Sequence, residues 1–169
     1  TQWIEDGGYF TSPIVLTTSH SVGIAHHATT SWLFEQYEAQ YRNEHVWSMP
    51  VVAETYDGVT NDINGLHVQE EDVLYALRHA QSGSIAEGNV GGGTGMITYD
   101  FKGGSGTSSR IVEVDGEVYT VGVFVQSNFG RRPYLTIAGV PVGQQMPKEV
   151  VKEDDRGSII VIVATDAPL

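Results

Sequence analysis

The chain contains no cysteine among its 169 residues. This excludes disulfide bonds, thiolate catalysis and cysteine-based zinc sites, although it does not identify the compartment. Basic residues are also scarce, since 9 Lys and Arg against 21 Asp and Glu give a formal net charge of −12. A protein this acidic would be repelled by phosphate groups, so we expect no nucleic acid and no membrane among its partners. An acidic cleft would instead suit a substrate with a free amine.

Long hydrophobic runs are missing as well. No stretch approaches the roughly 18 apolar residues of a transmembrane helix, and no basic segment followed by an apolar one opens the chain as in a signal peptide. We therefore expect a cytoplasmic protein. The chain begins at Thr1 and not at Met, which leaves open what precedes it. With 40% hydrophobic and 18% charged residues, the composition predicts a folded, globular chain that forms a single domain over residues 1–169.

The residue pattern predicts alternating strands and helices. The spacing of apolar residues predicts helices at 22 to about 42 and at 69–80. Acidic residues at the start of the second helix and basic residues at its end also favour a helix there, because they match the helix dipole. Runs rich in β-branched and aromatic residues predict strands at 14–17, 97–102, 118–126 and 135–142. The apolar run 159–164 does not alternate, so we expect a central strand there that is buried on both faces.

Glycine is concentrated in the middle of the chain. Residues 88–95 hold five glycines in eight positions, and a second glycine- and serine-rich segment lies at 103–109. Glycine-rich loops can cradle a phosphate, but neither nucleotide-binding spacing occurs, and the lysine of the P-loop is absent. The segment after Gly95 also reads as a strand instead of the required helix. The plainer interpretation is that these loops allow tight turns and close backbone packing.

Polar side chains that could form a site have plain alternatives. His20, His26 and His27 could suggest a metal, but the two adjacent histidines would point to different faces of a helix, so we predict no metal site. Glu54 lies where a strand enters a turn and reads as a solvated carboxylate, while Asn128 reads as a turn asparagine.

Ser158 is the most informative residue. It comes after Gly157 at the end of the charged segment 148–156 and begins an apolar strand. A serine at such a boundary can attack its own preceding carbonyl, and a glycine there leaves the backbone room for the attack. The cut would give the serine a free α-amine with a pKa of about 7.7 to 8.0, which could act as general base for its own hydroxyl. A simple Gly-Ser turn is the alternative.

Four ordered motifs resemble those of one family, and they lie at 86–96 (AEGNVGGGTGM), 101–110 (FKGGSGTSSR), 121–128 (VGVFVQSN) and 157–169 (GSIIVIVATDAPL). They are similar to the DmpA/BapA-type aminopeptidases, the L-aminopeptidase/D-esterase and β-aminopeptidase group of self-processing serine hydrolases. The resemblance runs from about residue 13 onward. It implies an α+β fold, an α-β-β-α sandwich of the DmpA type with Ntn-hydrolase-like layering.

The resemblance also implies roles for particular residues. Ser158 matches the family nucleophile, which becomes the N-terminus of a second subunit after cleavage between Gly157 and Ser158. Asn128 matches the asparagine that stabilises the oxyanion, and Glu54 the acid that receives the substrate's ammonium. Tyr56 matches a tyrosine that only some members have at the active site.

The family pattern extends beyond this chain. A second serine and a glutamate that complete the family's catalytic centre would lie beyond Leu169, so we expect these residues to be an internal portion of a longer protein. Residues 1–157 would belong to the alpha subunit and 158–169 would begin the beta subunit. The resemblance implies a small peptide, amide or ester substrate with a free amine, no cofactor, and a homo-oligomer of processed pairs. A non-catalytic binding or scaffold relative that is not processed is the alternative, and a nucleotide-binding domain is a more distant one.

Overall fold

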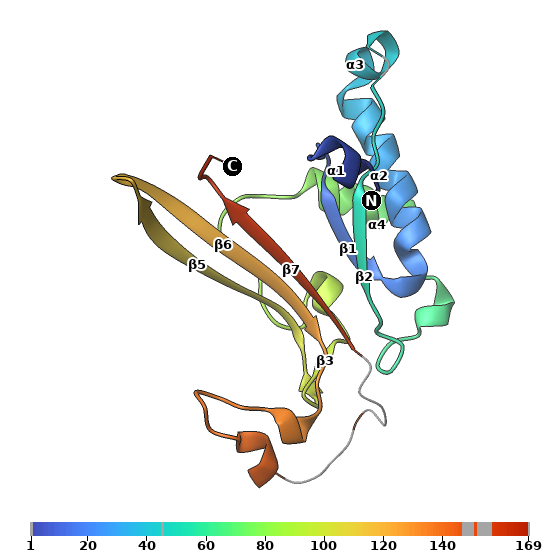
Figure 1. Cartoon of the computed structure of the whole chain (residues 1–169). Coiled ribbons are helices and arrows are strands. Elements are labelled where there is room, and N and C mark those ends of the chain that lie inside the picture. The colour runs from blue at the N-terminus through green and yellow to red at the C-terminus, as the bar shows by residue number, and fades with distance from the viewer. Residues whose placement is uncertain (1, 45, 147–150, 152–156, 169) are drawn as a thin grey trace. The chain divides into compact units, whose positions relative to one another are not determined.

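The computed structural model describes residues 2–44, 46–146, 151 and 157–168. The chain forms two compact units, residues 1–54 with 62–83 and residues 55–61 with 84–169. The helices are α1 (Gln2–Gly7), α2 (Val22–Gln36), α3 (Glu38–Asn43) and α4 (Glu70–Arg78). The strands are β1 (Ile14–Thr18), β2 (Val51–Thr55), β3 (Ile97–Thr98), β4 (Phe101–Lys102), β5 (Gly104–Val114), β6 (Glu117–Asn128) and β7 (Ser158–Thr165) (Figure 1). Short 3-10 turns occur at Ser19–Ser21, Ile63–Gly65, Gly91–Gly93, Arg132–Tyr134 and Val142–Gln145.

The first unit packs α2 and α4 beside the two-stranded sheet of β1 and β2 (Figure 1). Ala25 and Ala28 of α2 are fully buried and pack against Val73 of α4, with Val15 and Val52 from the two strands beside them. The alanines let the two helices approach closely, because their side chains end at Cβ. The strand predicted at 14–17 and the helix predicted at 69–80 are confirmed by β1 and α4.

The predicted continuous helix from 22 to about 42 is wrong, because the chain leaves helical geometry at Tyr37. This residue has φ −125° and ψ 36°, and it separates α2 from α3. The rings of Phe34 and Tyr41 pack edge to face across the break, with centroids 4.6 Å apart. Residues at i, i+4 and i+8 can therefore satisfy a helical pattern even where one residue between two helices departs from it.

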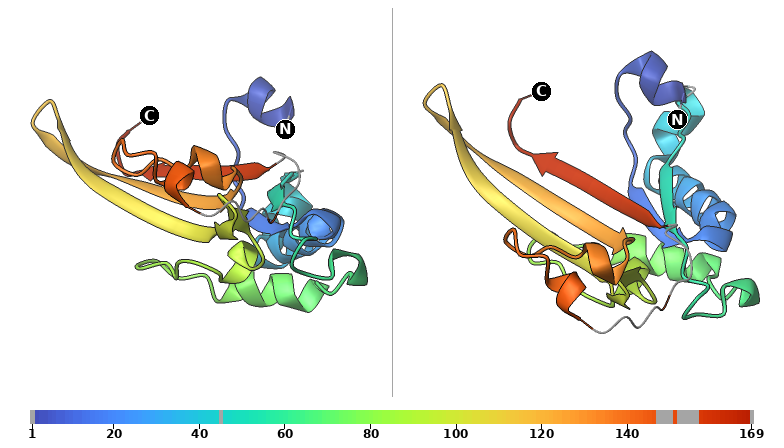
Figure 2. Two further views of the ribbon diagram at one scale, coloured as in Figure 1. Left: turned by 90° about the horizontal axis from the view of Figure 1, so that it is seen from below. Right: turned by 60° about the horizontal axis from the view of Figure 1, so that its bottom comes forward.

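The second unit is built on an antiparallel sheet in the order β5-β6-β7. β5 and β6 form a long hairpin that reaches beyond the end of β7 (Figure 2). Asp115 and Gly116 turn the hairpin with φ values of 53° and 84°, the pair of positive angles that a two-residue type I′ turn requires. The strand predicted at 118–126 is confirmed by β6. The glycine- and serine-rich segment 103–109 lies largely in strand β5, which the loop interpretation missed.

The prediction that the strand after Ser158 is central and buried on both faces is wrong. β7 pairs only with β6 among the described strands, and its burial alternates along the strand. Ile159, Val161 and Val163 share one face and are 51%, 52% and 64% exposed. A continuous apolar run thus gives this strand two apolar faces, and the described residues cover one of these faces better than the other.

Two further strand predictions are wrong. The segment 97–102 is a tight hairpin, β3 and β4, because Tyr99 and Asp100 adopt positive φ values of 52° and 60°. The segment 135–142 forms no strand, and among the described residues its only ladder contact is a bridge between Ile137 and Val140. The β-branched residues of the segment 135–142 lie in turns, so its composition resembles that of a strand although it does not form one.

None of the helices in the described ranges is long and apolar enough to cross a membrane.

Candidate active site

The pairing of β6 with β7 brings two of the predicted site residues together. The antiparallel register places Ser158, the first residue of β7, directly opposite Asn128, the last residue of β6. The Asn128 side chain donates from Nδ2 toward Ser158 Oγ over 3.4 Å, a distance at the long end for a hydrogen bond. Asn128 is only 2% exposed, so its interpretation as a plain turn asparagine is wrong.

The amide of Asn128 is held in one orientation. Its Oδ1 accepts a hydrogen bond from the backbone N–H of Ile97 in β3, at 3.0 Å. Its Nδ2 donates to the backbone carbonyl of Tyr56, at 2.7 Å. An acceptor at one end and a donor at the other distinguish the two ends of the amide, so the remaining N–H points toward Ser158. A fixed N–H donor beside a serine hydroxyl can stabilise an oxyanion that forms there.

Gly157 lies against the end of β6. A Cβ atom at this position would come within 2.7 Å of the Asn128 carbonyl oxygen and of Phe129 Cα. Side chains are excluded from position 157 because both of these atoms belong to the backbone and cannot move aside easily. The glycine therefore allows the peptide bond before Ser158 to lie close to Asn128.

Tyr56 contributes its backbone to this cluster. Its carbonyl is the acceptor for Asn128, whereas the residue as a whole is 50% exposed. Its predicted catalytic role stays a prediction.

Glu54 lies in the first unit, at the penultimate position of β2. Its Oε2 accepts a hydrogen bond from the hydroxyl of Ser19, which directly follows the neighbouring strand β1. The carboxylate is exposed and is thus able to bind a cation. Its assignment to the substrate's ammonium stays a prediction.

A second layer of polar residues surrounds Asn128 that the sequence patterns did not predict. Gln126 and Thr55 are 1% and 0% exposed, and the Gln126 amide donates to the Thr55 hydroxyl at 2.5 Å. Thr98 Oγ1 lies 2.7 Å from the Ser127 hydroxyl and donates to the Ser127 carbonyl at 2.9 Å. The alternation of a strand offered a signal, because Gln126 and Asn128 follow the apolar run 121–125, are two residues apart and so share a face.

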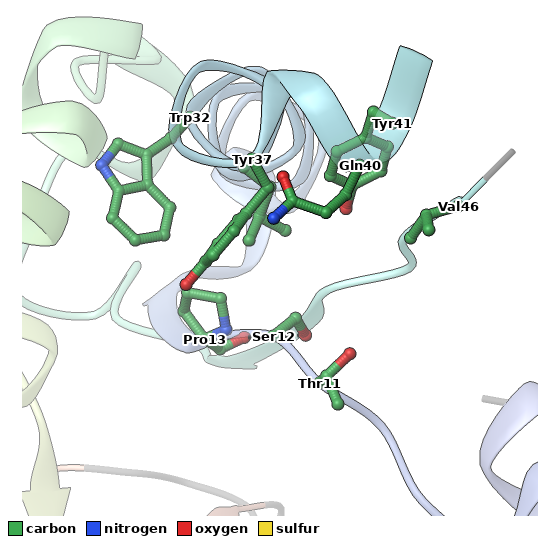
Figure 3. Close-up of a pocket in the computed structure, with 9 residues that line it drawn as sticks. Thr11, Ser12, Pro13, Trp32, Tyr37, Gln40, Tyr41 and Val46 are labelled. Carbon is green, nitrogen blue, oxygen red and sulfur yellow. Dashed lines mark hydrogen bonds between the residues drawn. The ribbon is translucent and has the colours of Figure 1, made fainter. Parts of the chain in front are cut away.

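Within the described part of the chain, no three His, Asp or Glu side chains are grouped closely enough to hold a metal ion. A cavity of about 530 Å³ in the first unit lies between α2, α3 and the segment before β1, where Pro13, Trp32, Tyr37 and Tyr41 line it (Figure 3). None of the predicted site residues borders this cavity.

Solved structures define the class of fold. The chain superposes on the L-aminopeptidase D-Ala-esterase/amidase from Ochrobactrum anthropi with a TM-score of 0.91 and 55% identity, covering 100% of this chain and 46% of that one. That protein is described as a prototype for the serine aminopeptidases and as a variant of the Ntn-hydrolase fold. A β-aminopeptidase from Burkholderia sp. matches with a TM-score of 0.86 and 46% identity over 99% of this chain and 45% of its own. The fold is therefore α+β of the DmpA, Ntn-hydrolase type, as predicted.

The chain belongs to peptidase family S58, whose family model matches residues 1–169. Its sequence is 49% identical to the β-peptidyl aminopeptidase BapA of Sphingosinicella microcystinivorans, over 100% of this chain and 45% of that protein. It is 41% identical to BapA of Sphingosinicella xenopeptidilytica, over 98% of this chain and 44% of that protein. The predicted DmpA/BapA-type family is thus confirmed, and the chain spans less than half the length of these relatives.

Proposed function

We propose that this chain carries the nucleophile and an oxyanion donor of a self-processing serine aminopeptidase. The substrates are small peptides, amides or esters with a free amine, in keeping with the aminopeptidase names of its relatives. The observation that carries the proposal is the register that sets Ser158 opposite Asn128, with the Asn128 amide directed at Ser158 Oγ. A buried amide held by two backbone partners beside a strand-initial serine suits oxyanion stabilisation better than turn formation.

Self-processing begins at the peptide bond between Gly157 and Ser158. Ser158 Oγ attacks the Gly157 carbonyl carbon, and the bond from that carbon to Ser158 N breaks as the nitrogen takes up the hydroxyl proton. The resulting ester is hydrolysed by water, which leaves a carboxylate on Gly157 and both a hydroxyl and an α-amine on Ser158. Asn128 Nδ2 stabilises the oxyanion in both steps.

Turnover uses the same hydroxyl and the same oxyanion donor, and the Ser158 α-amine now serves as the general base. The Ser158 α-amine, unprotonated in an appreciable fraction of molecules at neutral pH, accepts the hydroxyl proton as Oγ attacks the substrate carbonyl. The leaving amine takes that proton as the acyl-enzyme ester forms, and water then releases the acid. Glu54 binds the substrate ammonium, which would restrict the enzyme to N-terminal residues.

Intact-protein mass spectrometry of the full-length gene product tests the proposal. Wild type is expected to give two fragments, the second beginning at Ser158, and Ser158→Ala a single uncut chain without aminopeptidase activity. Cleavage retained in Ser158→Ala would overturn the assignment of the nucleophile. An uncut wild type would favour a non-catalytic binding protein on the same fold.

A further inference from the structure

The side chains of Gln126 and Asn128 hold two consecutive residues of the segment 55–61. Both project from the same face of β6, because they are two residues apart on one strand. Gln126 Nε2 donates to the Thr55 hydroxyl at 2.5 Å, and Asn128 Nδ2 donates to the Tyr56 carbonyl at 2.7 Å. The Tyr56 carbonyl fixes the Asn128 amide. Its own position is fixed in turn by the hydrogen bond from Gln126 to the preceding residue, Thr55.

The Gln126–Thr55 contact is deeply buried and closely packed. The two residues are 1% and 0% exposed. The glycine turn Gly91–Gly93 packs onto the amide, since a Cβ atom at Gly92 would lie 2.5 Å from Gln126 Oε1. This close approach leaves the Gln126 side chain little freedom to move away from Thr55.

Burial of this amide is unfavourable in itself. Gln126 Oε1 has no hydrogen-bond partner among the residues that the structure describes. An apolar side chain of similar size would fill the same space without burying an unpaired acceptor. A purely structural role is therefore a poor explanation for a glutamine here, whereas a role that requires its N–H donor accounts for it.

We propose that Gln126 and Thr55 are positioning residues for the oxyanion donor, an inference that rests on the proposed function. Their hydrogen bond keeps the Tyr56 carbonyl in place, and that carbonyl keeps the Asn128 amide directed at Ser158. Charge develops on the substrate oxygen only as the transition state forms, so loss of this alignment lowers kcat and leaves KM nearly unchanged.

Two substitutions at Thr55 separate the hydroxyl from the volume it occupies. Thr55→Val removes the hydroxyl and keeps the shape, and we expect kcat and the rate of self-cleavage to fall by about 10- to 100-fold, the effect of a small misplacement of a reacting group. Thr55→Ser keeps the hydroxyl and should restore both rates. The assay is hydrolysis of an aminoacyl anilide by the full-length protein, with kcat expressed per processed chain, alongside a time course of cleavage.

Thr29→Val is the matched control. Thr29 is also 0% exposed, and its hydroxyl donates to the Ala25 carbonyl within α2 at 2.7 Å. It should lower Tm by an amount similar to that of Thr55→Val and leave kcat unchanged. If it lowers kcat as much as Thr55→Val, general destabilisation explains the effect and the inference fails.

Gln126→Met tests the same contact from the other side. It should lower kcat like Thr55→Val, and the double variant should be no slower than the worse single one, because both changes remove one interaction. This variant decides the question if Thr55→Val does not fold. A Gln126→Met enzyme with wild-type kcat, or one in which only KM rises, would overturn the inference. Failure of the proposed function would be recognised separately, as an uncut wild type.

Discussion

At the scale of single residues, both ends of the Asn128 side-chain amide are engaged. The Ile97 N–H binds its oxygen, and the Tyr56 carbonyl binds its nitrogen. An aspartate has the same shape but no N–H to donate. The structure therefore accounts for an amide, and not a carboxylate, beside Ser158.

Asn128→Asp is expected to lower kcat and the self-cleavage rate by at least about 10²- to 10³-fold, the range found for loss of an oxyanion donor. The new carboxylate would face the Tyr56 carbonyl as a second acceptor and would repel the developing oxyanion. Steady-state kinetics and a cleavage time course measure the effect.

The control for this change is Gln69→Glu. The Gln69 side chain donates to the Leu66 carbonyl at 3.0 Å, in the first unit. Its replacement turns another amide that donates to a backbone carbonyl into a carboxylate without touching Asn128 or Ser158, so both rates should stay close to those of wild type. Equal losses in the two variants would contradict the role of Asn128.

At the scale of elements, the segment before the glycine turn is attached to strand β5 by Glu87. Its Oε1 accepts hydrogen bonds from the Thr107 hydroxyl and, at 2.8 Å, from the Thr107 backbone N–H. These two bonds lower the pKa of the Glu87 carboxyl below its ordinary value, and the bond from the hydroxyl has the larger effect. The bonds join residues 20 apart in the sequence.

The lowered pKa predicts a pH-dependent contribution to stability. Because the folded chain prefers the ionised form, the contribution is present above the ordinary carboxyl pKa of about 4.3 and is lost as pH falls through the lower pKa of the folded state. Glu87→Gln should therefore reduce Tm at pH 7, and the difference from wild type should shrink toward pH 3. Thermal unfolding across this range measures it.

Glu117→Gln serves as the control, since it removes an exposed carboxylate from β6, the strand that pairs with β5. A Tm difference for Glu87→Gln that does not change with pH would rule out the proposed ionisation effect.

Local patterns predicted some elements well and others poorly. β1, α4 and β6 are predicted by apolar spacing and by charges at helix ends, which act within a few residues. The hairpin at 97–102 was not predicted by this spacing, because two residues with positive φ interrupt what reads as one alternating strand. β5 was missed because glycine and serine, which are poor strand formers, take up its first residues and gain their strand geometry from pairing with β6.

At the scale of the whole molecule, one face of β7 remains apolar and exposed. Ile159, Val161 and Val163 lie on that face, and each is at least half exposed. Contiguous apolar side chains on an open strand favour association with other chains.

A polypeptide limited to these 169 residues is therefore predicted to self-associate. Size-exclusion chromatography with light scattering measures its state. Val161→Lys, which places a charge on the exposed face, should raise the monomer fraction. A monodisperse, monomeric wild-type polypeptide would refute the prediction.

The amino-acid sequence alone was enough to predict the family, the α+β class and the candidate site residues Ser158, Asn128, Tyr56 and Glu54, because ordered motifs and local spacing are properties of the chain. Which of these residues lie together became evident only from the folded structure. Asn128 and Ser158 are 30 residues apart and are joined by strand register, while Gln126 and Thr55 are 71 apart and meet through burial. Pairing over such separations depends on how the strands align and which faces they bury, and a register shift of one residue would turn Asn128 away from Ser158.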